Sequence, residues 1–437
     1  MSSDIFAPDF KTDPYWWEAA PRPKTRERPL PAETDVVIVG SGYTGTSAGL
    51  TLARNGRGVL LLDAEDPGYG ASSRNAGYVG RTLWYKFQPL MRKYGMDLAK
   101  QLAGQAVEAH NYTVKLIEKE QIRCFFNYSS RFIAAHTPSH YKKLAKDYEA
   151  LRAAGIEMDI EMVPRERQHD EIGSDRYYGG IVLHGSGSVH PGLYHLGLLD
   201  RAVASGADVH GGTRVTNIAR DRDGWYSVMT SRGLVRARDV IVATCGYTGP
   251  EMAWLRRRIL PIRLFQIATE PLPKATLDQL IPRGRTILDS KINIYWIRRS
   301  PDDTRIILGG RTGIEEGGLT GKARALHAVM TEVFPDMKGV KITHCWEGQT
   351  GFTFDELPHI GVHDGIYYAM GYCGVGLPMG TYLGHVVGLK VLGNPEGRTP
   401  FDGQLFPARS YYQGKPWFLP ALITYFNSID WWDRMRG

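Results

Sequence analysis

One stretch near the N-terminus constrains the fold of this chain more than any other: an apolar run followed directly by a GxGxxG pattern. Asp35–Val39 reads DVVIV, a β-branched run typical of a strand buried on both faces. Gly40 permits a tight turn, Gly42 lets the backbone approach a pyrophosphate, and Gly45 lets the next helix pack on the strand. The sequence therefore predicts a strand, a turn and a helix over Thr46–Asn55.

A second apolar run, Val59–Leu62, follows Gly56, which is placed to end the helix, and leads into Asp63 and Ala64. A carboxylate at the tip of the second strand, about 20 residues past the glycines, suits a ribose diol. A structural βαβ unit without a ligand remains the alternative. Because strand, helix and acid all stand in the expected order, the stretch favours a dinucleotide site in an α/β domain.

Composition narrows the class of protein. At 437 residues, two domains are expected. The four cysteines are scattered without CxxC spacing, so we expect neither a metal site nor a disulfide framework, and a reducing compartment fits. No apolar run approaches 18 residues and no secretory leader is evident, which predicts a cytoplasmic protein without a transmembrane segment. The net charge of +7 is dispersed, which does not favour a nucleic-acid partner.

Residues 68–77 read GYGASSRNAG and resemble a second contact to a nucleotide ligand more than a linker. Small residues let the backbone approach a flat ligand, and polar side chains supply donors to phosphate or polyol oxygens. The polar residues are Ser72, Ser73, Arg74 and Asn75, followed by Ala76 and Gly77.

Two later strands also run into glycine turns. Asp239–Ala243 leads to Gly246, and Ile366–Met370 leads to Gly374. Since such strand ends border the ligand crevice of doubly wound sheets, the first domain is predicted to be discontinuous. We expect an N-terminal arm over 1–33, with its three aromatics at 15–17 packed on a domain surface. The nucleotide-binding domain is assigned to 34–85, 185–255 and 345–437, and an α+β substrate domain with a mainly antiparallel sheet to 86–184 and 256–344.

The ordered motifs GSGYTG, Asp63, GASSRNAG, ATCGYTG, LPHIG and GYCGVGLPMG resemble the amine and amino-acid oxidase family that includes D-amino-acid, glycine and sarcosine oxidases. The aromatic arm and the PWFLPALITYF tail look most like its γ-glutamylputrescine oxidase branch. The resemblance implies a Rossmann-like domain that binds FAD. It assigns to FAD the residues Gly40, Gly42, Gly45, Asp63, Ala64, Ser72, Ser73, Arg74, Asn75, Ala76, Gly77, Val215, Gly246, Gly374, Val375, Gly376 and Leu377.

Departures from the family pattern bear on the substrate. D-amino-acid oxidases hold the substrate carboxylate with an arginine in the segment corresponding to Gln349–Thr353, where this chain has none. A plain α-amino acid is therefore disfavoured. Arg298, Arg299 or Arg81 would be the replacement, and a surface ion pair is the alternative for each.

Two further departures concern the flavin. The oxygen-activating lysine of sarcosine oxidases would fall near Ile307, which favours transfer of electrons to an acceptor other than O2. Some relatives attach FAD through a histidine in the loop of Asn75, which is missing here, or through a cysteine near Cys345. We expect non-covalent FAD, with Cys345 as a buried core thiol.

The resemblance implies oxidation of the C–N bond of a primary or secondary amine, such as a γ-glutamylated or N-substituted one, by hydride transfer to flavin. The flavin is reoxidised by O2 or another acceptor. Tyr295 and Trp296 are the first candidates to line the cavity, with core packing as the alternative. Two other functions remain open: an amino-acid oxidase or dehydrogenase of the same fold, and a flavin-binding protein in RNA modification. The oligomeric state is not predicted.

Overall fold

The computed structural model describes residues 5–25, 28–156, 158–311 and 317–436, and it begins its core with the predicted βαβ unit. β2 (Glu33–Val39) and β3 (Val59–Leu62) pair in parallel, and α2 (Tyr43–Arg54) connects them. All of β3 and the last four residues of β2 are buried. Gly56 ends the helix in the left-handed conformation, at φ +74°. The predicted α/β start of the chain is confirmed.

These strands belong to an eight-stranded sheet with a parallel centre. β19, β12, β2, β3 and β9 pair in parallel, β10–β12 form an antiparallel meander, and β18 pairs antiparallel with β19. The remaining strands of this sheet are β9 (Asp208–His210), β10 (Val215–Arg220), β11 (Tyr226–Thr230), β12 (Gly233–Val242), β18 (His359–His363) and β19 (Ile366–Met370).

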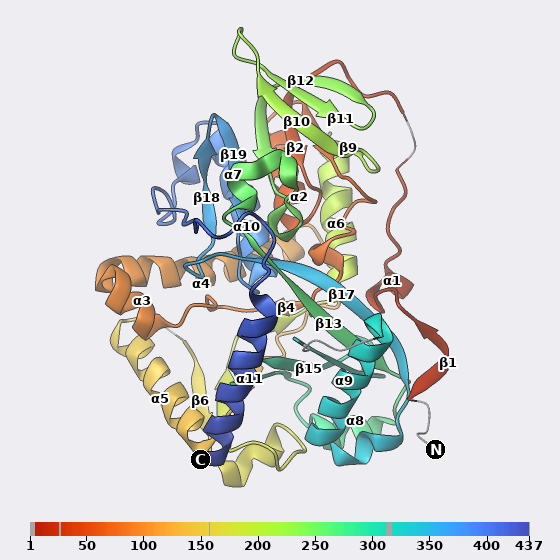
Figure 1. Cartoon of the computed structure of the whole chain (residues 1–437), viewed down its shortest axis with the longest axis vertical. Coiled ribbons are helices and arrows are strands. Elements are labelled where there is room, and N and C mark those ends of the chain that lie inside the picture. The colour runs from red at the N-terminus through yellow and green to blue at the C-terminus, as the bar shows by residue number, and fades with distance from the viewer. Residues whose placement is uncertain (1–4, 26–27, 157, 312–316, 437) are drawn as a thin grey trace.

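Helices cover one face of this sheet and the meander covers the other (Figure 1). Val36 and Ile38 of β2 pack with the helices, whereas Val37 and Val39 pack with the meander, as the alternation of a strand requires. The four helices on the first face are α2, α4 (Met96–Lys119), α6 (Pro191–Ala204) and α10 (Gly376–Val391), and the short α7 (Ala253–Arg256) lies on the other.

A nine-stranded, mainly antiparallel sheet forms the second lobe, in the order β1-β17-β13-β16-β15-β14-β5-β7-β6. Its strands are β1 (Phe6–Lys11), β17 (Ile342–Phe352), β13 (Leu260–Thr269), β16 (Ile306–Gly310), β15 (Tyr295–Arg299), β14 (Thr286–Asp289), β5 (Arg131–Ala134), β7 (Gly180–Leu183) and β6 (Ile160–Val163). The other elements are α1 (Trp16–Ala19), β4 (Tyr78–Val79), α3 (Phe87–Tyr94), α5 (Pro138–Ala153), β8 (Gly187–Ser188), α8 (Lys274–Leu280), α9 (Gly318–Val333) and α11 (Leu419–Arg436).

The two faces of the nine-stranded sheet have different neighbours. Phe265 and Ile267 of β13 pack in the core that α8 and α9 cover. The opposite face, which we call the inner face, looks toward the first lobe, and Trp16 of the N-terminal arm is fully buried against it. The expected packing of the arm is therefore confirmed. The inner face carries Gln266, Ala268, Trp296, Arg298, Ile307 and Trp346.

The lobes do not divide the chain where the sequence places its boundaries. α4, assigned to the substrate domain, packs against α10 in the helical core of the first lobe, because its apolar stripe is buried there. The boundary at 345 falls inside β17. α11, assigned to the nucleotide-binding domain, docks on the second lobe (Figure 1), where Asp430 accepts hydrogen bonds from the N–H groups of Ile292 and Asn293 at 3.0 and 3.2 Å.

Candidate active site

The glycine turn after β2 brings two pieces of backbone into contact. Gly40 has φ +100°, and a Cβ on Gly45 would lie only 1.9 Å from the carbonyl oxygen of Gly40. A Cβ on Gly42 would lie 2.8 Å from Oγ of Ser72, in the second predicted loop. The N-cap residue Gly42 has no side chain that could cap α2. Ser72 accepts from the N–H of Tyr43, which leaves the N–H groups of Thr44 and Gly45 as the first-turn donors that an anion could meet.

Asp63 lies at the end of β3, beside the glycine turn. Its Oδ2 accepts a hydrogen bond from the N–H of Ser41 at 2.9 Å and another from the Ser41 hydroxyl. Burial raises the pKa of the Asp63 carboxyl, although these hydrogen bonds oppose the shift. The N–H of Thr213 donates to the carbonyl of Asp63 at 2.7 Å, so the segment that enters β10 at Val215 starts beside Asp63 and the half-buried Ala64.

The hydroxyls of the second loop hold that loop against its neighbours. Oγ of Ser72 accepts from the N–H of Tyr43, the first residue of α2, at 2.9 Å. Oγ of Ser73 donates to the carbonyl of Gly68 at 2.7 Å and accepts from Nε1 of Trp17 at 2.8 Å. The loop and the N-terminus of α2 are thus joined directly.

Arg74 and Asn75 are also engaged within the protein. Nε of Arg74 donates to the carbonyl of Tyr69 at 2.7 Å, and Nη1 donates to the carbonyl of Glu347 at 3.1 Å. The Asn75 amide donates to the carbonyl of Ala71 at 3.0 Å. These donors fix the shape of the loop, which leaves backbone groups as the main surface it offers to a ligand.

The late glycine junction lies against the early one. Oη of Tyr372 and Oγ1 of Thr44 are 2.7 Å apart, and a Cβ on Gly384 would lie 2.3 Å from the Thr44 carbonyl oxygen. Gly374 has φ +93°, and Val375 provides no side-chain cap to α10. The N-terminus of α2 therefore packs against the middle of α10 and against Tyr372, which precedes that helix. The first two residues of α10 are the predicted Gly376 and Leu377.

The third glycine turn packs on the second lobe. A Cβ on Gly246 would lie 3.0 Å from the carbonyl oxygen of Gln349 in β17. Oη of Tyr247 accepts from the N–H of Gln349 at 3.1 Å. The Gln349 side-chain amide donates to the Gly246 carbonyl. This contact places β17 at the edge of the predicted nucleotide site.

Inner-face side chains reach the second loop. Nε2 of Gln266 and Nε1 of Trp346 both donate to the carbonyl of Arg74, at 2.5 and 2.9 Å. Nε1 of Trp296 donates to Oε1 of Gln266 at 3.3 Å. Neither Gln266 nor Trp346 is a site residue that the sequence predicts. Once β13 and β17 are known to belong to one sheet, the alternation of apolar residues along each strand indicates which face Gln266 and Trp346 lie on.

Arg298 and Tyr295 lie on opposite faces of β15. Arg298 is buried, and its Nη1 donates to the carbonyls of Ala76 and Val189 at 2.8 and 2.9 Å. Burial lowers the pKa of the Arg298 guanidinium to about 10. Tyr295 packs at the edge of the core that α8 and α9 cover, which we call the outer core. The two predicted aromatics, Tyr295 and Trp296, therefore lie on opposite faces of β15.

The arginine candidates have different partners. Arg299 forms ion pairs with Asp278 and Asp303 at 2.8 and 2.9 Å, as the alternative of a surface ion pair has it, except that Arg299 itself is buried. Arg298 has no carboxylate partner among the described residues. Arg81 is half-buried, lines a cavity of about 470 Å³, and its Nε has no hydrogen-bond partner.

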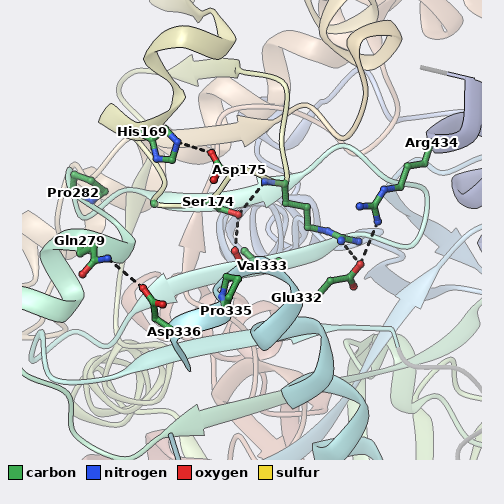
Figure 2. Close-up of a pocket in the computed structure, with 12 residues that line it drawn as sticks. His169, Ser174, Asp175, Gln279, Pro282, Glu332, Val333, Pro335, Asp336 and Arg434 are labelled. Atoms are coloured by element: carbon green, nitrogen blue, oxygen red, sulfur yellow. Dashed lines mark hydrogen bonds and ion pairs between the residues drawn. The ribbon is translucent and has the colours of Figure 1, made fainter. Parts of the chain in front are cut away.

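A larger hollow of about 840 Å³ lies on the second lobe (Figure 2). Its charged side chains face one another: Glu332 pairs with Arg176 and Arg434, and His169 lies 2.9 Å from Asp175. The predicted cofactor residues do not line it. Since most of its charged side chains already have partners and it lies apart from the predicted cofactor residues, we do not assign it the active site.

Neither a metal site nor a membrane-spanning helix is found within the described part of the chain. No group of three or more His, Cys, Asp or Glu side chains is arranged to hold a metal ion there. Over the same residues, no helix is long and apolar enough to cross a membrane.

Comparisons with known proteins show which family and which relatives this chain is similar to. A family model for FAD dependent oxidoreductases matches residues 35–388. Probable oxidoreductase OrdL of Haemophilus influenzae is 29% identical over 386 residues, which cover 87% of this chain and 88% of that protein. Gamma-glutamylputrescine oxidoreductase of Escherichia coli K12 is 30% identical over 367 residues, covering 83% and 84%. The crystal structure of glycine oxidase from Geobacillus kaustophilus shares the fold, with a TM-score of 0.70 at 20% identity over 87% of this chain and 100% of that one.

The glycine turn fits a dinucleotide such as FAD. A side chain at Gly42 would crowd Ser72 beside the N-terminus of α2, and one at Gly45 would push the helix away from Gly40. Asp63 lies next to this turn, where it accepts from the N–H of Ser41. Cys345, in contrast, is fully buried on the outer face of β17, and burial raises its pKa to about 12. A thiol that points away from the inner face is poorly placed to attach a flavin there, in keeping with the expectation of non-covalent FAD.

Proposed function

The chain belongs to the FAD dependent oxidoreductase family, and on that premise we propose that it oxidises the C–N bond of a primary or secondary amine. FAD, when bound, supplies a ring that accepts a hydride from the carbon beside the nitrogen. Water then hydrolyses the resulting imine to a carbonyl compound and an amine. The residues of this chain bind the amine, orient it and exclude water.

The observation that carries this proposal is the contact of the inner face with the second loop. Gln266, Trp346 and Arg298 each donate a hydrogen bond to a carbonyl of residues 74–76. A substrate bound between the inner face and a flavin held by that loop would be fixed from both sides. Trp296, hydrogen-bonded to Gln266, is the aromatic candidate that lies on this face.

The side chains at the C-terminal end of β17 favour an amine substrate over a plain α-amino acid. Gln349 donates to Gly246, and the neighbouring Thr350 carries no positive charge. No residue of Gln349–Thr353 can therefore hold a carboxylate by an ion pair. The 30% identity to gamma-glutamylputrescine oxidoreductase supports an N-acylated amine as the substrate class.

An amino-acid oxidase or dehydrogenase is the second candidate, because Arg298 brings a buried positive charge to the inner face. Its guanidinium already donates to the carbonyls of Ala76 and Val189 in the first lobe, which favours a role in positioning over one in binding a substrate carboxylate.

Ile307 supports an electron acceptor other than O2. It lies on the inner face, fully buried beside Trp16 and Trp346. The resemblance to sarcosine oxidases implies that their oxygen-activating lysine would fall near this residue. An apolar side chain supplies no positive charge to stabilise reduced oxygen, so reoxidation in air should be slow.

The test is an anaerobic screen of the purified yellow protein. Acylated diamines, simple diamines and α-amino acids are added in turn, and loss of the flavin absorbance is recorded before and after air is admitted. Bleaching by amines, with slow recovery in air, is the expected result. Bleaching by α-amino acids alone would refute the substrate class, and a protein that takes up no FAD would refute the whole proposal.

A further inference from the structure

A second feature of the inner face lies on β5, at the far side of β14 and β15. Phe132 and Ala134 of β5 are buried in the outer core, so the alternation of the strand turns Arg131 to the inner face. Arg131 is in register with Thr286, and Ile287 is in register with Ile297. Arg131 therefore lies two strands from Arg298, about 10 Å away at a spacing of about 4.8 Å per strand.

Arg131 is buried without a protein partner for its charge. Only 8% of the residue is exposed, and its Nε is buried with no hydrogen-bond partner. Over the described part of the chain, its guanidinium joins no ion pair and donates no hydrogen bond; its contact is with the ring of Tyr78, 5.0 Å away. Tyr78 itself donates to the carbonyls of Ile287 and Ile297, so it is fixed beside β14 and β15.

Two more unpartnered nitrogen atoms lie close by. Nε of Arg81 and Nδ1 of His110 are both buried without a hydrogen-bond partner. Burial, and then the nearby charges of Arg81 and Arg131, lower the pKa of His110 to about 4, which keeps the imidazole neutral. A Cβ on Gly80, the residue before Arg81, would lie 3.1 Å from Nη2 of Arg131, so the two arginines are neighbours and form one cluster. Neither forms an ion pair with a carboxylate of the described residues, although Asp159 lines the same cavity as Arg81.

The cluster differs from the other arginines of the inner-face region. Arg298 has three carbonyl acceptors, and Arg299 has two carboxylates. A guanidinium that is removed from water and left unpaired is strongly unfavourable, so an anion that reaches it is bound tightly. The unpaired guanidinium groups of Arg131 and Arg81 are therefore the signature of a ligand that carries negative oxygen atoms.

We propose that Arg131 and Arg81 bind a carboxylate or phosphate group of the amine substrate, at the end away from the carbon that is oxidised. The proposal rests on the proposed amine oxidation and narrows its substrate class to amines that carry an acidic group. The FAD pyrophosphate is the less suitable anion, because the N-terminus of α2 is the site expected for it and Arg131 lies on the opposite lobe.

The first experiment compares two substrates on the FAD-loaded protein: putrescine acylated with succinate, which leaves a free carboxylate, and putrescine acylated with butyrate, which leaves none. Wild-type protein should prefer the acidic amine in kcat/KM. R131Q and R81Q should each lose about tenfold to a hundredfold with the acidic amine, mainly in KM, and little with the neutral one. An equal loss with both amines, or no preference in the wild type, would refute the proposal.

The second experiment needs no turnover. Succinate, inorganic phosphate and methylammonium chloride are each added to the FAD-loaded protein, and the melting temperature is recorded. Succinate or phosphate should raise it in the wild type and not in R131Q, and the stronger of the two identifies the preferred anion. Without anion, R131Q should melt no lower than the wild type, because it removes an unpaired buried charge.

R165Q is the matched control, since Arg165 also stacks on a tyrosine, Tyr178, but at the exposed surface. It should keep the response to anions. If the anions stabilise the protein and no amine bleaches the flavin, the anion site stands and the amine oxidation fails. If amines bleach the flavin and the anions have no effect, the anion site fails. Loss of bound FAD from R131Q would show that the cluster holds the cofactor and would also refute the site.

Discussion

Gly45→Ala tests whether the backbone contact at the glycine turn holds both the fold and the cofactor. The added Cβ would start 1.9 Å from the carbonyl oxygen of Gly40 and 3.2 Å from Cγ2 of Ile38. A Cβ is essentially never found closer than 3.0 Å to another heavy atom, so α2 and the turn must separate by at least about 1.1 Å. The clash is with backbone, which no change of rotamer can relieve.

Two effects of this separation can be measured. Overpacking of this kind costs about 1–3 kcal/mol of unfolding free energy, and more where the backbone cannot yield. The first-turn amides of α2 would also move relative to Gly40, and loss of one hydrogen bond to a phosphate costs about 1.5–3 kcal/mol, or tenfold to a hundredfold in FAD affinity. Urea unfolding of the apoprotein gives the first value, and quenching of flavin fluorescence on titration gives the second.

Gly49→Ala is the control on the same helix. Its Cβ would lie 3.6 Å or more from its neighbours, an ordinary contact, and alanine is the better helix former by about 0.5–1 kcal/mol. G49A should therefore be as stable as the wild type or more so, with unchanged FAD affinity. If G45A behaves like G49A in both measurements, the close contact does not exist and the argument from the glycine turn fails.

Three other changes have separate readouts. Asp63→Ala should lower FAD affinity measurably, whereas Asp63→Asn, which keeps the shape, should lower it less; flavin released on gel filtration measures both, and wild-type retention in D63A would disprove the ribose assignment. Cys345→Ala should leave the flavin content unchanged, with all flavin in the supernatant after acid precipitation; flavin in the wild-type pellet that C345A lacks would show a covalent bond. Asp430→Ala leaves the N–H groups of Ile292 and Asn293 without acceptors and should destabilise the docking of α11 by about 1–3 kcal/mol. Faster proteolysis within 419–436 measures that loss, and an unchanged cleavage rate would contradict it.

The features that the sequence predicts well are local ones. The turn of Gly40, Gly42 and Gly45, the helix after it and the strand that ends at Asp63 are specified within 30 residues of chain, and the structure has them in that order. The late junction at Gly374 was also recognisable, because a strand, a glycine turn and a helix follow each other directly. Only local periodicity and turn chemistry are needed for such units.

Placement across the lobes was not recognisable in the same way. α4 has an ordinary amphipathic stripe, and nothing in that stripe shows whether it packs on α10 or on the second sheet. α11 is held by Asp430, which meets backbone groups about 137 residues earlier in the chain. Domain boundaries drawn from changes of local pattern therefore miss both helices.

The arginines show why substrate-binding residues could not be predicted without knowing the sheet topology. Arg298 and Arg299 are neighbours in sequence and equal candidates by residue type, but the alternation of β15 separates their environments. Arg299 meets Asp278 and Asp303, while Arg298 meets carbonyls of the first lobe. Arg131 carries no sequence signal at all, because a single arginine at the start of a short strand is usually at the surface.

The state of the partners, more than the residue type, distinguishes a ligand-binding arginine from a structural one. Arg298 has carbonyl acceptors and Arg299 has carboxylate partners within the protein. Their burial therefore costs little free energy when no ligand is bound, and both can stabilise the fold on their own. A buried guanidinium without acceptors is stable only when something else supplies them. This asymmetry predicts opposite signs for two substitutions without ligand: Arg298→Gln should destabilise the protein, whereas Arg131→Gln should not. Melting temperatures of the two variants in buffer free of polyvalent anions decide it, and a large destabilisation in R131Q would place Arg131 among the structural arginines.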